Sequence, residues 1–104
     1  MERYKLIISE EAKSNMRSVA RYITNELHEP ATAKKMLFRI RQEIASLKTM
    51  PERYALSTNS RYAKKGYRVT SAGKYLIFYR VDKPSKTVEV LNVLHGSRNM
   101  SQWL

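Results

Sequence analysis

The residues of this sequence best suited to chemistry are a set of cationic, aromatic and imidazole side chains in its second half. The set comprises Arg68, Tyr79, Arg80, His95 and Arg98. Arginine can bind a phosphate group through two parallel hydrogen bonds, and a histidine with its ordinary pKa of about 6.5 can transfer a proton near neutral pH. Metal-free RNA cleavage needs a base for the 2′-hydroxyl, an acid for the leaving oxygen and cations that stabilise the transition state. The set could supply these parts if the strands that carry it pair in register.

A structural role explains two of these residues as well as a chemical one does. His95 ends an apolar segment, where an imidazole can bond to a backbone carbonyl. Arg80 lies close in sequence to Asp82 and Glu89, and either carboxylate could form an ion pair with it. Both interpretations stay open, and the balance leans against an enzyme.

Other common chemistries find no support in the sequence. There is no cysteine, which excludes disulfides and thiolate zinc sites. His28 and His95 are the only histidines and are not spaced as metal ligands, and three glycines form no phosphate-binding loop. We therefore expect no metal ion and no cofactor.

Positive charge is concentrated in the second half of the chain. The net charge is +11, from 20 Lys and Arg residues against nine Asp and Glu. Residues 1–52 carry ten basic and seven acidic side chains (+3), whereas residues 53–104 carry ten basic and two acidic ones (+8). Such a field concentrates polyanions such as RNA, DNA or an acidic protein segment, although a merely solvated basic surface is the alternative. The cations expected to bind a target or a phosphate group are Arg61, Lys64, Lys65, Arg68, Arg80 and Arg98.

Three strands must position most of these side chains. Residues 66–95 contain three β-rich segments, which are separated by Ala72-Gly73 and by the sequence Asp-Lys-Pro-Ser-Lys at 82–86. Turn residues between apolar and aromatic segments predict an antiparallel meander. The middle segment, 74–81, is the most apolar, as expected of a central strand that is buried on both faces. We expect one apolar and one cationic face.

The first half predicts a strand followed by two helices. Residues 4–8 (Tyr-Lys-Leu-Ile-Ile) are β-prone and should join the sheet. Ser9 resembles an N-cap, and the apolar helical stripe behind it should end near His28, because Pro30 disfavours helix in the residue before it. Pro30 suits the first turn of a second helix, which should end by Pro51. The resulting αα-hairpin should pack on the sheet in an α+β fold.

We expect a single domain over residues 1–104. Residues 50–65 have the composition of a linker. A short segment after Gly96 carries Met100, Trp103 and Leu104, which should dock on this domain or on a partner. No apolar segment approaches the roughly 18 residues of a membrane-spanning helix, and the first residues lack the apolar core of a signal peptide. These features predict a cytoplasmic protein.

Several short segments, in this order and spacing, resemble the RelE/ParE superfamily of toxins from bacterial type II toxin–antitoxin modules. The resemblance covers nearly the whole chain. Its segments are residues 4–8, Ser9-Glu10-Glu11-Ala12, Met50-Pro51-Glu52-Arg53, Lys64-Lys65-Gly66-Tyr67-Arg68, Leu76-Ile77-Phe78-Tyr79-Arg80-Val81 and Val93-Leu94-His95-Gly96-Ser97-Arg98. The fold that it implies is an αα-hairpin packed on a twisted antiparallel sheet.

The resemblance implies a growth-inhibiting toxin of the plasmid-stabilisation type. RelE-type members cleave mRNA in the ribosomal A site, whereas ParE-type members inhibit DNA gyrase. The RelE pattern has basic residues where this sequence has Thr70 and Leu76, so the ParE branch is favoured. For a RelE-type endoribonuclease, the residues implied are Arg68, Tyr79, His95 and Arg98.

Either branch implies an acidic antitoxin that orders as it wraps the hairpin or the sheet edge, in a toxin–antitoxin hetero-oligomer. The C-terminal Met100, Trp103 and Leu104 are candidate contacts with that antitoxin or with the target. The target would be DNA gyrase or, in the alternative, the ribosome and its mRNA. A third hypothesis is a non-toxic basic domain that binds nucleic acid.

Overall fold

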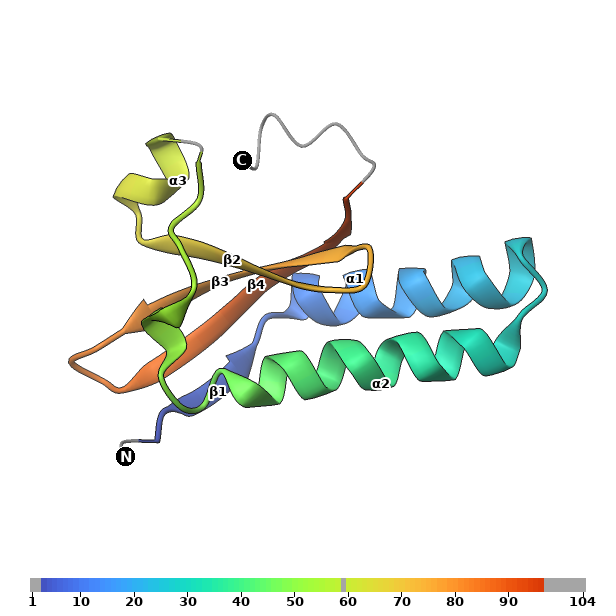
Figure 1. Ribbon diagram of the computed structural model, residues 1–104, viewed down its shortest axis with the longest axis horizontal. Helices are drawn as coiled ribbons and strands as arrows, with labels where there is room; N and C mark the ends of the chain where they lie inside the picture. Colours follow the sequence, from blue (N-terminus) through green and yellow to red (C-terminus); the bar gives the residue numbers. More distant parts are fainter. Residues whose placement is uncertain (1–2, 59, 97–104) are drawn as a thin grey trace.

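The computed structural model describes residues 3–58 and 60–96, which form a four-stranded sheet with two long helices on one face (Figure 1). The strand order in the sheet is β1-β4-β3-β2. The elements in chain order are β1 (Lys5–Ile8), α1 (Glu10–Arg21), the π-helical turn η1 (Tyr22–Glu26), α2 (Pro30–Ser46), the 3₁₀ turn η2 (Pro51–Arg53), α3 (Ser60–Lys64), β2 (Tyr67–Ala72), β3 (Tyr75–Asp82) and β4 (Thr87–His95).

The meander is confirmed, but the sheet is mixed rather than antiparallel throughout. β2 pairs with β3 and β3 with β4 in antiparallel fashion, with Arg68 opposite Tyr79 and His95 opposite Tyr75. β1 joins the other side of β4 in parallel, with Lys5 beside Thr87. Parallel neighbours need a long crossover, which the helices and the meander supply here. The five-residue β-prone segment at 4–8 carries no signal of strand direction, so the sequence could not predict this pairing.

The helical hairpin follows the prediction except where it turns. Ser9 is the N-cap of α1, because its hydroxyl accepts a hydrogen bond from the Ala12 amide at 3.0 Å. The regular helix ends at Arg21 and the chain continues as a π-helical turn, in which the Leu27 amide donates to the Tyr22 carbonyl. His28 then adopts a left-handed conformation (φ 55°) just before α2 begins at Pro30.

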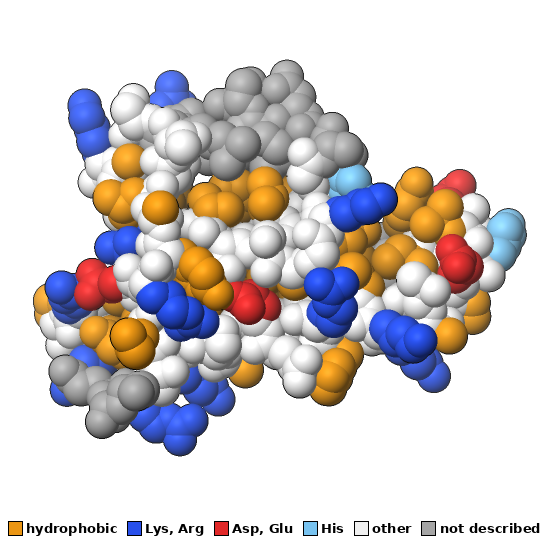
Figure 2. Space-filling model, viewed as in Figure 1, with side chains coloured by type: hydrophobic (Ala, Val, Ile, Leu, Met, Phe, Trp, Pro, Cys, Tyr) orange, Lys and Arg blue, Asp and Glu red, His pale blue; other side chains and the backbone are white. Residues whose placement is uncertain are grey.

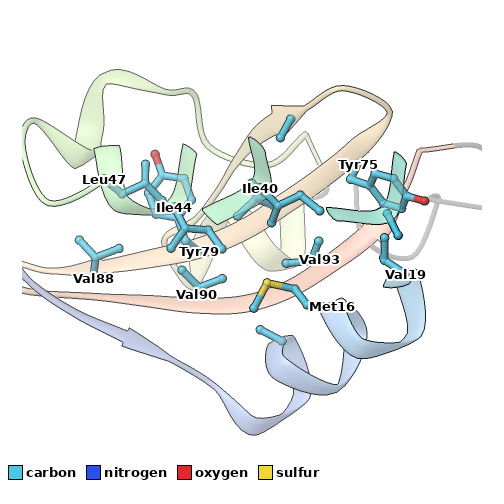
Figure 3. Close-up of a cluster of buried hydrophobic side chains, with 14 of the residues drawn as sticks. Met16, Val19, Ile40, Ile44, Leu47, Tyr75, Tyr79, Val88, Val90 and Val93 are labelled. Carbon is cyan, nitrogen blue, oxygen red and sulfur yellow. The ribbon is translucent and has the colours of Figure 1, made fainter. Parts of the chain in front are cut away.

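The core lies between the two helices and one face of the sheet (Figure 3). Most of the two predicted apolar stripes is buried in it, although Leu27 at the end of the first stripe is exposed. Fully buried side chains such as Ile40, Ile44 and Tyr79 lie at its centre. The opposite face of the sheet, which we call the open face, carries a second and smaller apolar cluster. Its members are Val69, Leu76, Phe78 and Leu94. The expected contrast between an apolar and a cationic face is therefore not found at the centre of the sheet.

Side chains from the start of the hairpin form hydrogen bonds with the edge of β4, at the positions beyond the end of β1. Ser9 donates its hydroxyl proton to the Leu91 carbonyl at 2.9 Å. The Asn15 side-chain oxygen accepts hydrogen bonds from the Val93 amide at 3.0 Å and from the Asn92 side chain at 3.3 Å. These contacts cover a strand edge that would otherwise present unpaired backbone groups.

Removal of the Asn15 acceptor should destabilise the protein. Asn15→Ala leaves the amide of buried Val93 without its partner, at a cost of roughly 1–3 kcal/mol in the free energy of unfolding. Asn15→Asp is the matched control, because its carboxylate can accept both hydrogen bonds. Urea unfolding of the three proteins measures the difference, and equal losses for both variants would contradict the role of the acceptor.

No helix in the described part of the chain is long and apolar enough to cross a bilayer.

Candidate target-binding surface

The short helix α3 presents three of the predicted target-binding cations. Arg61 and Lys64 lie on α3 and Lys65 follows it, and all three side chains are exposed. The sequence predicted a linker here rather than a helix. The run from Ser60 to Lys65 contains no Gly or Pro, and this was the signal that could have predicted a helical turn.

An aromatic pair holds α3 against the sheet. The ring of Tyr62 on α3 stacks on that of Tyr67 on β2, with centroids 5.4 Å apart and planes 8° from parallel. Gly66, with φ of 81°, makes the sharp turn between helix and strand that a side chain would strain. We call the residues Arg61, Tyr62, Lys64, Lys65 and Tyr67 the α3 surface. Figure 2 shows lysine and arginine side chains projecting around α3, with hydrophobic side chains beside it.

Arg80 borders the α3 surface on the open face. It lies opposite Tyr67 in the pairing of β2 with β3. Its guanidinium forms an ion pair with Glu89 on β4 at 3.1 Å, which is the structural alternative that the sequence had left open. Both side chains are partly exposed, and exposed pairs of this kind are weak, so the pair does not prevent Arg80 from contacting an anion.

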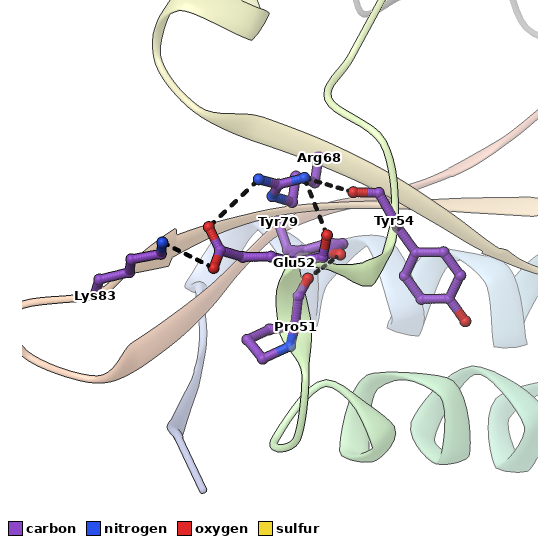
Figure 4. Close-up of polar contacts among 6 residues, drawn as sticks. All are labelled: Pro51, Glu52, Tyr54, Arg68, Tyr79 and Lys83. Carbon is purple, nitrogen blue, oxygen red and sulfur yellow. Dashed lines mark hydrogen bonds and ion pairs between the residues drawn. The ribbon is translucent and has the colours of Figure 1, made fainter. Parts of the chain in front are cut away.

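Arg68 lies on the opposite face of the sheet from Arg80, where it holds the η2 segment (Figure 4). It donates to the Tyr54 carbonyl at 2.6 Å and the Glu52 carbonyl at 3.4 Å, and it forms an ion pair with the Glu52 carboxylate at 3.5 Å. Lys83 approaches the same carboxylate at 3.2 Å. Only 18% of the Arg68 side chain is exposed, so its donors are engaged with the protein itself.

Tyr79, the cross-strand partner of Arg68, also contacts η2. Its buried hydroxyl donates to the Pro51 carbonyl at 2.6 Å. Burial raises the pKa of Tyr79 to about 12, despite the opposing effect of Arg68 and Arg53. A hydroxyl with so high a pKa is poorly matched to proton transfer near neutral pH.

His95 lies at the other end of β3, beside Tyr75 rather than Tyr79. Its ring meets that of Tyr75 edge to face, with centroids 5.1 Å apart. Tyr79 lies four residue steps along the strand from Tyr75, which is about 13 Å. The structure therefore brings Arg68 and Tyr79 together but not His95. The remaining predicted site residues, Arg98, Met100, Trp103 and Leu104, lie outside the described residues.

The sequence and the fold can now be compared with known proteins. The family described as the ParE toxin of the type II toxin–antitoxin system parDE matches residues 6–100. This chain belongs to the ParE toxin family. The match confirms the RelE/ParE resemblance of the short segments and makes the protein a toxin of the type II toxin–antitoxin class. No curated protein sequence matches it significantly.

Solved structures of toxins have the same fold as this ParE-family chain. A chain of the chromosomal ParDE system of P. aeruginosa superposes with a TM-score of 0.72 at 16% identity, over 88% of this chain and 95% of that one. A mutant of the E. coli toxin RelE in the free state superposes with a TM-score of 0.65 at 13% identity, over 96% of this chain and 90% of that one. A chain of the Mycobacterium tuberculosis RelBE2 complex superposes with a TM-score of 0.56 at 22% identity, over 91% of this chain and 93% of that one. At these identities the likeness establishes the fold, which confirms the α+β prediction.

Proposed function

We propose that this ParE-family protein inhibits DNA gyrase by binding, without catalysing a reaction. The observation that carries the proposal is the chemistry at the two positions where the RelE pattern has cations. Leu76 belongs to the apolar cluster on the open face. Thr70 is buried and donates its hydroxyl proton to Glu43 on α2 at 2.7 Å. Both positions serve packing in this chain, and neither can stabilise a phosphate.

The hydrogen bonds that Arg68 and Tyr79 form within the protein support the same proposal. Their polar groups hold the η2 segment on the sheet, and Tyr79 has no exposed surface. A ribonuclease built on these residues and His95 would need groups that converge on one phosphate, since a misplacement of about 1 Å is already costly. Arg68, Tyr79 and His95 do not converge within the described residues.

The α3 surface is the proposed contact with the target. Arg61, Lys64 and Lys65 are exposed there, and Arg80 extends the cationic area across the open face. Charge of one sign on a compact surface steers association with an acidic partner and sets its orientation. Arg98, which follows β4, is proposed to belong to the same contact.

The natural partner is proposed to be an acidic antitoxin. The neighbouring structures from P. aeruginosa and M. tuberculosis come from a ParDE system and a RelBE2 toxin–antitoxin complex. With a net charge of +11, this chain favours an acidic segment that folds as it binds. A cytoplasmic hetero-oligomer of the two proteins follows from this proposal.

A supercoiling assay with purified gyrase tests the proposed target. We expect relaxed plasmid to remain unconverted when the protein is present, and cleaved plasmid to accumulate after denaturation, because the gyrase–DNA cleavage complex is trapped. Supercoiling at the control rate together with no trapped cleavage would refute gyrase as the target.

Two parallel measurements test the other functions. Toeprinting of an actively translated mRNA should show no new cleavage, and A-site cleavage that depends on this protein would establish the RelE-type alternative instead. Induced expression should arrest growth, with rescue by the neighbouring acidic antitoxin. Normal growth combined with salt-dependent binding to nucleic acid would indicate a basic binding domain.

A further inference from the structure

A cavity of about 380 Å³ lies between α1, η1 and the ends of β3 and β4. His95 and Tyr75 line it, whereas the α3 surface adjoins the opposite end of β3, where Arg80 pairs with Tyr67. The cavity is therefore separate from the α3 surface. Its volume is in the range of sites that bind small molecules or single chemical groups.

The floor of the cavity is apolar and its mouth is aromatic. Val19 and Leu94 are each 8% exposed, and Tyr75 is 7% exposed, beside Val19 at one end of the core (Figure 3). Tyr22 lines the same cavity but is 52% exposed. It is the first residue of the π-helical turn, a feature that occurs often at functional sites. An exposed aromatic ring beside a cavity is a platform on which a planar group can stack.

Polar groups accompany the aromatic rings in the cavity wall. Asn15, Ser18 and His95 line it together with the two tyrosines. Burial and the nearby Tyr22 raise the pKa of Tyr75, so its hydroxyl stays protonated and can donate. A purely apolar side chain from a partner would offer no hydrogen bond to a polar side chain of the wall such as Ser18. A planar ring with a polar edge can offer one.

We propose that this cavity binds a base of a single-stranded nucleic acid, with the ring stacked on Tyr22 and its polar edge toward Ser18 and His95. Lys74 directly precedes Tyr75 of the cavity wall, and its side chain is exposed, so a cation that could contact the phosphate lies one residue along the chain from the wall. Aromatic stacking together with a cation is the usual chemistry of single-strand recognition. The net charge of +11 attracts such a ligand. This inference goes beyond gyrase inhibition and does not require it.

Binding of the full chain to a fluorescein-labelled (dT)8 strand, measured by fluorescence anisotropy without gyrase, tests the proposal. We expect Tyr22→Ala to weaken binding about tenfold, and Tyr22→Phe to restore it, because the phenyl ring still stacks. Phe38→Ala removes another exposed aromatic side chain, on α2, and is the matched control that should leave affinity unchanged. An abasic strand of the same length should bind the wild-type protein no more tightly than (dT)8 binds Tyr22→Ala.

Two outcomes would overturn the proposal. Equal affinity for the abasic strand and (dT)8 would mean that charge alone binds the strand. NMR titrations provide the second comparison, with thymidine 5′-monophosphate and N-acetylphenylalanine amide as probes. We expect the nucleotide to shift the resonances of Tyr75 and His95. Shifts with the phenylalanine probe alone would assign the cavity to a side chain of a protein partner. Neither experiment depends on the supercoiling assay, so failure here is distinguishable from failure of the proposed function.

Discussion

Replacement of both Lys64 and Lys65 by glutamate is expected to abolish gyrase inhibition, with at least about a 100-fold rise in the concentration needed to block supercoiling. The two side chains are exposed at the end of α3, next to the stacked tyrosines. Reversal of their charge places like charges against an acidic target, which costs several kcal/mol. A loss of roughly 2.7 kcal/mol already corresponds to a 100-fold change in affinity.

The hairpin offers a matched control for this charge reversal. Lys34→Glu with Lys35→Glu changes the net charge by the same amount on exposed positions of α2, and it should inhibit nearly as well as the wild-type protein. Circular dichroism should show that both variants are folded. Similar inhibition by the two variants would mean that α3 is not the target contact, and that the overall charge of the protein matters more than its position.

Tyr79→Phe is expected to destabilise the protein near pH 7 and to stabilise it near pH 12. Near pH 7 the variant loses the hydrogen bond to Pro51, at a cost of roughly 1–2 kcal/mol. Below pH 10 the hydroxyl is protonated in both the folded and the unfolded wild-type chain, so this difference should stay constant. Between pH 10 and about 12 the unfolded tyrosine ionises while the buried one remains protonated, which removes stability from the wild-type protein as the pH increases.

The size of this effect makes the two stability curves cross. A rise in pKa from 10.0 to about 12 is equivalent to roughly 2.7 kcal/mol, which exceeds the cost of the lost hydrogen bond. The variant should therefore be the more stable protein near pH 12. Urea unfolding at several pH values between 7 and 12 measures both curves. A constant difference over this range would show that the Tyr79 hydroxyl is accessible to solvent in the folded state.

The strongly periodic parts of the sequence predicted their structure well. Both helical stripes and all three strands of the meander formed as expected, because burial of an apolar face determines each of them. The direction of β1 could not be predicted in this way, since a four-residue strand can pair in either direction. The helix α3 spans five residues, too few for a periodic pattern, and the Tyr62–Tyr67 stack that holds it against the sheet is a tertiary contact between side chains.

The candidate site was harder to predict than the fold, because its geometry depends on strand register. The Gly73-Lys74 turn pairs Ala72 with Tyr75, and this register places Arg68 opposite Tyr79, on the other face from Arg80. The sequence predicts a turn at Ala72-Gly73, but that prediction alone does not determine which residues of the two strands pair. The hydrogen bonds from Arg68 to η2 could not be foreseen, since they join parts of the chain that sequence patterns treat separately.

The parallel pairing of β1 with β4 also bears on how the protein is made. These strands join residues 5–8 to residues 87–90, and the Ser9–Leu91 hydrogen bond spans 82 positions. A ribosome that adds about 5–20 residues per second needs roughly 4–16 s to synthesise that interval. Throughout this time β1 and the hairpin have no β4 to cover their apolar surface. The sheet of the nascent toxin thus stays incomplete until β4 has been synthesised.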